Sequence, residues 1–205
     1  MTWMPLELPD ADVAMDATWL PPGEADALFD ALHAGIPWIV HRIRLFGRQV
    51  DSPRLSCWIG DPDAAYTYSG TRFAPQPWPA ALRPIRARLW RELGVDFNSV
   101  LANLYRDGRD RMGWHSDNER ELGLRPVIAS VSLGAPRRFV FRHRAQPSLK
   151  REVVLPDGSL LLMSGDTQAN YRHALPATAR SVGARINLTF RRITVQAAGP
   201  HPAIG

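Results

Sequence analysis

The stretch ARINLTFRRITV, residues 184–195, decides the fold class, because polar and apolar side chains alternate along it as they do in a β-strand. Every second position is polar, so four side chains share one face of the strand: Arg185, Asn187, Thr189 and Arg191. Two guanidinium groups that face a sheet interior are costly to bury without an anion. The stretch therefore predicts a buried strand that binds a dicarboxylate. The alternative is a half-buried strand with solvated arginines, and one of Arg191 and Arg192 must face outward in either case.

Short alternating or β-branched runs upstream predict further strands, over 38–46, 99–105, 126–133, 138–143, 152–156, 159–163 and 171–175. Two helices are expected earlier in the chain, over 21–35 and 77–94, and the segment before the first helix is expected to be irregular. The second helix places four apolar residues on one stripe, Leu82, Ile85, Leu89 and Leu93. Helices followed by a series of strands indicate a mainly β fold, an antiparallel roll of two sheets with flanking helices, rather than a βαβ fold.

The composition favours one compact domain over residues 1–205, because the chain is 45% hydrophobic and 22% charged and contains no linker or repeat. No apolar run reaches the roughly 18 residues of a membrane-spanning helix, and the first residues are acidic where a secretory signal would be basic. We therefore expect a cytoplasmic protein without membrane contact, and a monomer by default. The single cysteine, Cys57, excludes an intramolecular disulfide and a zinc ribbon, so any metal must have nitrogen and oxygen ligands.

Positive charge is concentrated in the second half of the chain. Residues 1–100 hold 9 Arg and 12 acidic residues, whereas residues 101–205 hold 15 Arg, 1 Lys and 8 acidic residues. The stretch RRFVFRHRAQPSLKR (137–151) has six basic residues and no acidic one. Clustered positive charge of this kind is typical of proteins that bind nucleic acid. The alternative is a set of solvated basic strands.

The segment GWHSDNERELG (113–123) carries candidate metal ligands. His115 and Asp117 are two residues apart, and on an extended strand this spacing directs both side chains to one face. His173, on another predicted strand, is the third candidate. Two imidazoles and one carboxylate form the facial triad of non-haem Fe(II) oxygenases. A histidine near a strand end is also common as a structural residue, so the pair alone is weak evidence.

Together these motifs resemble the AlkB-type 2-oxoglutarate- and Fe(II)-dependent dioxygenases, which demethylate alkylated bases in nucleic acids. The ordered set consists of N-L-Y (103–105), H-x-D (115–117), H-A-L-P (173–176) and R-x-N-x-T-x-R (185–191). PRLSCWIGD (53–61), YTYSG (66–70) and PVIASVSLG (126–134) are similar to the branch that contains the vertebrate DNA-repair homologues. The resemblance implies a double-stranded β-helix, or jelly roll, whose core spans about 97–195 and carries a nucleotide-recognition region at about 37–75.

The resemblance also implies the cofactors and their ligands. Fe(II) would be held by His115, Asp117 and His173. The far carboxylate of 2-oxoglutarate would be held by Asn103, Tyr105 and Arg185, and the carboxylate beside the iron by Arg191 with Asn187 nearby. Dioxygen is the other co-substrate, and the products are succinate, carbon dioxide, formaldehyde and the restored base.

A base must leave its stack to reach such a site, and the resemblance implies residues that receive it. They are Tyr68, which would stack on the base, Tyr66 and Glu119 at its edge, Arg54 and Trp58 at the pocket wall and nucleic-acid backbone, and Phe46 as a wedge. A carboxylate at position 119 suits cationic bases such as 1-methyladenine and 3-methylcytosine. Core packing is the alternative for Trp58 and Phe46.

The function predicted is thus the oxidative demethylation of alkylated DNA or RNA. One alternative is a 2-oxoglutarate-dependent hydroxylase of a small molecule, a lipid or a protein side chain, which would have no use for the basic stretch 137–151. A binding module without catalysis is a second alternative, against which the complete set of ligand types argues.

Overall fold

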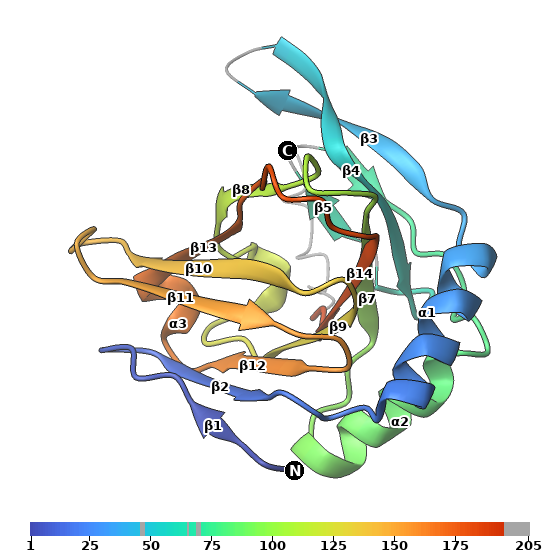
Figure 1. Cartoon of the computed structure of the whole chain (residues 1–205), viewed down its shortest axis with the longest axis horizontal. Helices are drawn as coiled ribbons and strands as arrows, with labels where there is room; N and C mark the ends of the chain where they lie inside the picture. The colour runs from blue at the N-terminus through green and yellow to red at the C-terminus, as the bar shows by residue number, and fades with distance from the viewer. Residues whose placement is uncertain (46–47, 65, 69–70, 195–205) are drawn as a thin grey trace, which may run out of the picture.

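The computed structural model describes residues 1–45, 48–64, 66–68 and 71–194, and between 42 and 49 and between 66 and 73 it describes the backbone alone. Two antiparallel sheets and two long helices build the molecule (Figure 1). No helix in these described ranges is long and apolar enough to cross a membrane.

The larger sheet has eight strands in the order β1-β2-β12-β9-β14-β7-β4-β3. Their bounds are Met4–Pro5 (β1), Asp12–Asp16 (β2), Leu160–Ser164 (β12), Ile128–Gly134 (β9), Arg185–Arg191 (β14), Ser99–Tyr105 (β7), Arg48–Gly60 (β4) and Ile39–Leu45 (β3). The strand β14 lies between β7 and β9 and pairs with both along its length. It is therefore a central strand.

The smaller sheet has four strands in the order β11-β10-β13-β8. Their bounds are Lys150–Leu155 (β11), Arg137–His143 (β10), Tyr171–Leu175 (β13) and Met112–His115 (β8). A separate two-stranded ribbon consists of β5 (Tyr66–Tyr68) and β6 (Thr71–Phe73). From β7 onward the chain passes back and forth between the two main sheets, with β10 and β11 as the one consecutive pair that stays in the same sheet, and this is the connectivity of a jelly roll. The fold class predicted from the sequence is confirmed.

The two long helices, α1 (Pro22–Gly35) and α2 (Leu82–Leu93), cover one face of the larger sheet (Figure 1). The alternation along β14 explains how: Ile186, Leu188 and Phe190 join the buried residues of both helices in one hydrophobic core. The opposite face of β14 looks toward the smaller sheet, across a second core that contains Phe141, Tyr171 and their neighbours. The polar positions of β14 therefore lie between the two sheets.

Both predicted helices are confirmed, although α2 begins at Leu82 rather than at residue 77. Its Pro84 is compatible with the helix, because the first N–H groups of a helix have no partner within it. Gly94 ends α2 with a φ of 68°, a left-handed conformation that glycine adopts without strain. The eight predicted strands correspond to β3, β7, β9, β10, β11, β12, β13 and β14.

The expectation of an irregular amino-terminal segment is wrong. The strand β2 pairs with both β1 and β12 and buries Val13 and Met15 in the core between the sheets. Five residues are too few for their alternation to be distinctive, and pairing with the distant β12 fixes them as a strand. Short additional elements are η1 (Arg120–Leu122), a 3₁₀ turn, and α3 (Thr167–Asn170).

Candidate metal centre and co-substrate pocket

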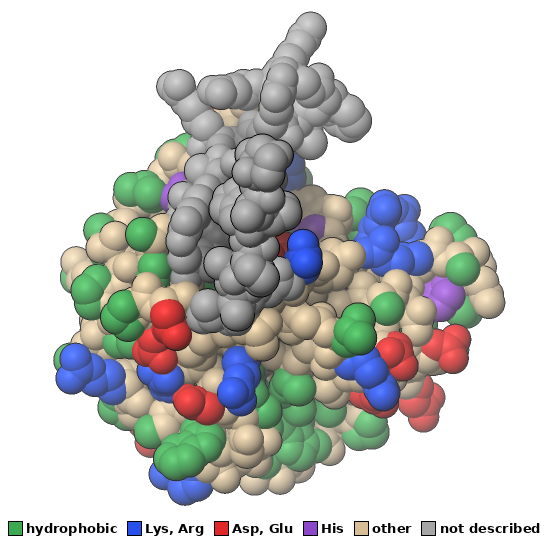
Figure 2. Space-filling model, turned by 180° about the vertical axis from the view of Figure 1, so that it is seen from behind, with side chains coloured by type: hydrophobic (Ala, Val, Ile, Leu, Met, Phe, Trp, Pro, Cys, Tyr) green, Lys and Arg blue, Asp and Glu red, His purple; other side chains and the backbone are tan. Residues whose placement is uncertain are grey.

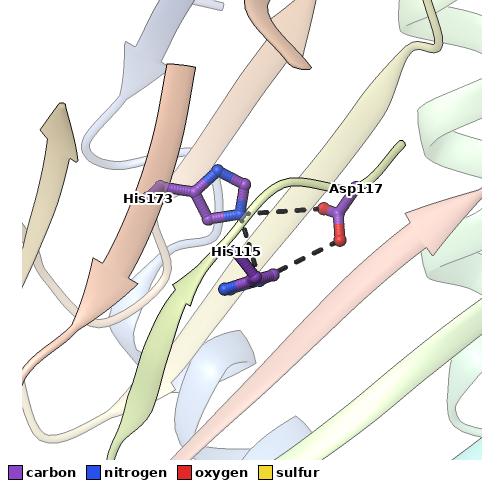
Figure 3. A group of neighbouring side chains, drawn as sticks. All are labelled: His115, Asp117 and His173. Carbon is purple, nitrogen blue, oxygen red and sulfur yellow. Dashed lines mark hydrogen bonds and ion pairs between the residues drawn. The ribbon is translucent and has the colours of Figure 1, made fainter. Parts of the chain in front are cut away.

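His115, Asp117 and His173 come together between the two sheets (Figure 3). The antiparallel register of β13 and β8 places His173 directly opposite His115. Asp117 follows two residues after His115, just beyond the end of β8, and its carboxylate turns back toward both rings. One ligand atom from each residue lies within 4.8 Å of the others. The triad predicted from the sequence is thus assembled by one strand pair and the loop that follows it.

The tautomer of His115 suits a metal ligand. Its Nδ1–H donates to the carbonyl oxygen of Gly113 at 2.9 Å, so Nε2 of the neutral ring has a lone pair. This Nε2 is 3.1 Å from Nε2 of His173. Burial lowers the pKa of both rings, and the neighbouring His115 also helps to lower the pKa of His173, to about 3. Both imidazoles are therefore neutral at neutral pH, as metal binding requires.

Asp117 is held as a carboxylate. Burial alone would raise its pKa, but the charge of Arg191 and its hydrogen bond to the carboxylate contribute to an opposite effect that lowers the pKa to about 2. Nη2 of Arg191 donates to Oδ1 of Asp117 at 2.6 Å. Oδ2 of Asp117 lies 3.9 Å from Nε2 of His173, and Oδ1 lies 4.0 Å from Nε2 of His115. Two neutral nitrogens and one anionic oxygen that converge in this way fit a divalent iron.

Other side chains fix the loop between the ligands. The backbone N–H of Asp117 donates to Oε1 of Gln168 on α3, at 2.9 Å. The hydroxyl of Ser116 donates to the carbonyl oxygen of Tyr171 at 2.7 Å and accepts a hydrogen bond from Arg144 at 2.8 Å. Neither Gln168 nor Ser116 carried a distinctive signal in the sequence, because the contacts join segments that are far apart along the chain.

A cavity beside the triad is lined by the polar face of β14 and by β7. Four of the residues predicted to bind 2-oxoglutarate lie on its wall, Asn103, Tyr105, Asn187 and Arg191, together with Leu101, Thr189 and Met163. The register of β14 and β7 places Asn187 opposite Asn103, and Arg185 opposite Tyr105. The amide of Asn187 donates to Ser130 Oγ and to the carbonyl oxygen of Val131, so the sheet already holds it in place.

Arg185 is fully buried, and burial lowers its pKa to about 10. Its Nη2 donates to Ser132 Oγ at 2.9 Å, and its guanidinium carbon lies 5.4 Å from the centre of the Tyr105 ring. Nε and Nη1 are buried and have no hydrogen-bond partner among the described residues. A buried cation with two open donors fits the carboxylate of a bound ligand. The donor set therefore fits 2-oxoglutarate as well as iron.

The comparison with protein families agrees with this geometry. The family described as the 2OG-Fe(II) oxygenase superfamily matches residues 12–191. The chain belongs to this superfamily. As a member of the 2OG-Fe(II) oxygenases, it uses Fe(II), 2-oxoglutarate and dioxygen, the cofactors predicted from the sequence.

Several curated proteins are similar to this 2OG-Fe(II) oxygenase. DNA oxidative demethylase ALKBH2 of Bos taurus is 42% identical over 180 residues, which cover 83% of this chain and 65% of that protein. The Homo sapiens protein of the same name is 41% identical, with 83% and 69% covered. Alpha-ketoglutarate-dependent dioxygenase alkB homolog 3 of Homo sapiens is 37% identical, with 83% and 62% covered. The matched region thus spans about two thirds of the length of these relatives.

The fold has a solved counterpart. A structure titled "The structure of OsALKBH1" superposes with a TM-score of 0.66 at 15% identity and covers 93% of this chain and 100% of that chain. At this identity the likeness concerns the fold, and it agrees with the jelly roll of this oxygenase.

The predicted base-binding residues are placed in different ways. Phe46 and the side chains of Tyr66 and Tyr68 lie outside the described residues. Glu119 is half-buried, next to η1, and its predicted contact with the base stays a prediction. Trp58 is buried in the core, and its indole N–H donates to the carbonyl oxygen of Ala64 at 2.9 Å. This placement agrees with core packing, the alternative given for Trp58, and its role at the pocket wall stays a prediction.

Arg54, which was predicted at the pocket wall and the nucleic-acid backbone, contacts a residue that lines the co-substrate pocket, and its contact with nucleic acid stays a prediction. It is buried, on β4, and donates to Asn103 in the co-substrate pocket. The region 37–75 that was predicted to recognise the nucleotide is joined to the core, because β4 pairs with β7 from Leu55 to Gly60. Its role in recognition stays a prediction.

Proposed function

We propose that this oxygenase demethylates alkylated bases, such as 1-methyladenine and 3-methylcytosine, in DNA or RNA. The observation that carries the proposal is the complete triad beside the fully buried Arg185, with two open donors, in a chain similar to enzymes named DNA oxidative demethylases. Iron, when bound, would supply the coupling between the oxidative decarboxylation of 2-oxoglutarate and the hydroxylation of the methyl group. The hydroxymethyl group would then leave as formaldehyde.

The chain's own residues would bind and orient 2-oxoglutarate. Arg185 would pair with the carboxylate far from the iron, since its guanidinium has two open donors and lies 5.4 Å from the ring of Tyr105, which lines the pocket. Arg191 would attract the carboxylate beside the iron, because it already lies against the metal ligand Asp117. The apolar wall around this site, including Phe139 stacked on His173 at 5.3 Å, would limit the access of water to the reacting groups.

A basic face on the outside of the smaller sheet supports a polyanionic substrate. We define this basic face by Trp114, Arg142, Arg144 and Arg172. Arg142 lies directly opposite Arg172 in the register of β10 and β13, an arrangement of like charges that destabilises a sheet unless an anion is nearby. The guanidinium of Arg142 stacks on Trp114, which is 39% exposed, with its central carbon 4.3 Å from the ring centre. Phosphate groups would stabilise this pair of arginines.

The view from behind is consistent with such a surface. Figure 2 shows a hollow in which red and purple side chains are visible, and Lys and Arg side chains, in blue, lie beside it. A nucleic-acid strand could then contact basic side chains while one base enters the hollow.

Not every arginine of the stretch 137–151 belongs to this face. Arg137 is buried and donates to the carbonyl oxygens of Asp107, Asp110 and Pro176. Arg138 pairs with Glu152 at 3.1 Å. Arg137 therefore lies inside the fold and is not part of the basic face.

The proposal is tested by incubating the protein with Fe(II), 2-oxoglutarate and oligonucleotides that carry one 1-methyladenine or one 3-methylcytosine. Single-stranded DNA, double-stranded DNA and RNA would be compared, and the base would be identified by mass spectrometry alongside formaldehyde release. The His173→Ala variant serves as the inactive control, because it lacks one metal ligand. The proposal would be supported if the parent restores the unmethylated base and releases formaldehyde while the His173→Ala variant does neither. Consumption of 2-oxoglutarate with every methylated base intact would overturn it and favour a hydroxylase of another substrate.

A further inference from the structure

Arg54 occupies an unusual position for a charged side chain. It is 6% exposed, lies on β4 and has no acidic partner among the residues that the structure describes. Its Nε–H donates to Oδ1 of Asn103 at 2.7 Å, and its Nη1–H donates to Oγ of Ser52 at 3.0 Å. A buried cation bonded to two neutral groups adds little net stability by itself. A role toward the neighbouring pocket would account for it.

The contact with Arg54 determines how the Asn103 amide is oriented. A guanidinium group has five N–H donors and no acceptor, so the Asn103 atom that it contacts must be the carbonyl oxygen. The Nδ2 group is then the end of the amide that remains, and it donates to no other described residue. Asn103 lines the cavity beside the metal ligands. Its remaining donors are therefore available to a ligand in that cavity.

We propose that Arg54 is a positioning residue for the co-substrate: by bonding Oδ1, it keeps the Asn103 amide turned so that Nδ2–H donates to the carboxylate of 2-oxoglutarate. This inference rests on the proposed role of Asn103 in binding that carboxylate. Without Arg54, the amide could rotate and present its oxygen to the carboxylate, and two acceptors that face each other repel. The donor on Arg54 thus selects one of two amide orientations that are nearly equal in shape.

The neighbourhood of Arg54 agrees with this role. In the register of β4 and β7, Ser56 lies opposite Asn103, and the alternation of the strand places Arg54 on the same face as Ser56. Asn103, which Arg54 contacts, lines the same cavity as the metal ligands His115 and Asp117. Arg54 therefore connects β4, which lies in the region 37–75 that was predicted to recognise the nucleotide, to the pocket for 2-oxoglutarate.

The test is a double-mutant cycle on 2-oxoglutarate binding, measured by calorimetry with Fe(II)-loaded protein in the absence of oxygen and of nucleic acid. Arg54→Leu and Asn103→Ala should each raise the dissociation constant about tenfold, because each removes an oriented hydrogen bond to a charged group. The double variant should bind no more than about twofold more weakly than Asn103→Ala, because Arg54 acts through Asn103. Ser52→Ala, which removes the other contact of Arg54, is the matched control and should change the constant less than twofold.

Two results would overturn the proposal. The first is a dissociation constant of the double variant that is raised by the product of the two single-variant factors. This would mean that Arg54 acts independently of Asn103. The second is an unchanged affinity of Arg54→Leu for 2-oxoglutarate together with weaker oligonucleotide binding, which would make Arg54 a direct nucleic-acid contact.

Asn103→Asp keeps the inference testable if Arg54→Leu does not fold. The new carboxylate would still pair with Arg54, but it would have no donor for the cavity, so 2-oxoglutarate binding should fall at least tenfold. Parent-like binding by Asn103→Asp would refute the donor role.

In steady-state assays with a methylated oligonucleotide, Arg54→Leu should raise the KM for 2-oxoglutarate and leave kcat near the parent value. Since the binding assay contains no nucleic acid, failure of the parent to demethylate would contradict the proposed function alone.

Discussion

Replacing Arg185 with methionine should stabilise the protein in the absence of 2-oxoglutarate and weaken the binding of 2-oxoglutarate. Burial lowers the pKa of this guanidinium from its ordinary value to about 10, which corresponds to a penalty of about 3 kcal/mol for the charged form in the fold. The pKa remains far above 7, so the group stays charged and the penalty applies at neutral pH. Methionine has a similar length and no charge to bury.

The expected increase in the free energy of unfolding is smaller than this penalty, because Arg185 also makes favourable contacts that methionine would lose. Loss of its hydrogen bond to Ser132 costs about 1 kcal/mol, and loss of its stacking on Tyr105 costs about 1 kcal/mol more. A net stabilisation of about 1 kcal/mol remains, or a rise of roughly 2–4 °C in the melting temperature for a chain of this size. In the opposite direction, loss of the two open donors should weaken 2-oxoglutarate binding by roughly 100-fold or more, at about 1.5–3 kcal/mol for each bond to a charged group.

Thermal unfolding with and without 2-oxoglutarate, and calorimetric titration of 2-oxoglutarate, measure the two effects. Arg138→Met is the control, because Arg138 forms an exposed ion pair with Glu152 and its loss should change stability by no more than about 0.5 kcal/mol. A variant at Arg185 that melts below the parent without 2-oxoglutarate, or that binds 2-oxoglutarate as the parent does, would refute the reasoning that a ligand carboxylate compensates this buried charge.

Further predictions concern the metal, its pH dependence and the arginines of the smaller sheet. His173→Ala should abolish Fe(II)-dependent turnover and weaken metal binding in a protein that keeps its circular dichroism spectrum, and formaldehyde release at the parent rate would contradict the triad. Because the pKa of His173 is about 3 and that of His115 is lowered, protons compete little with the metal, so Mn(II) affinity should change little between pH 8 and 6; a steep loss below pH 6.5 would indicate ordinary histidines. Arg142→Gln with Arg172→Gln should reduce the slope of log affinity against log salt for duplex DNA by up to about 0.9 for each lost phosphate contact, and an unchanged slope would make the basic face a solvated surface. Arg137→Ala should lower the free energy of unfolding by about 3 kcal/mol in denaturant titrations, because three backbone carbonyls lose their donor, and a loss below 0.5 kcal/mol would show that water replaces it.

The sequence predicted most where a feature is local. The alternation in β14 gave both the strand and its two faces, because side chains point to opposite sides of any strand. The same reasoning predicted the apolar stripe of α2, of which Leu82, Ile85 and Leu89 are buried. It failed for β2, whose five residues become a strand only through pairing with β12.

For the candidate site, the sequence predicted the chemistry but not the contacts of every residue. The ligand types and the motif set indicated the iron and 2-oxoglutarate chemistry before any distance was known. Arg54 and Trp58 were predicted at the pocket wall and the nucleic-acid backbone, with core packing as the alternative for Trp58, and the sequence did not indicate that Arg54 bonds Asn103 or that Trp58 bonds Ala64. A strand pattern tells which face a side chain takes and does not tell which residue of another strand lies opposite.

The sequence by itself therefore determined the fold class, the two faces of β14 and the residue types that can hold iron and a dicarboxylate. These follow from periodicity and side-chain chemistry, which are properties of short segments. Only the tertiary structure decided that His173 lies opposite His115, that Arg191 rather than Arg185 bonds Asp117, and that Arg137 is buried while Arg142 faces outward. The reason is physical: strand register and burial are set by the joint packing of both sheets, and the free energy of that packing depends on segments far apart in the chain.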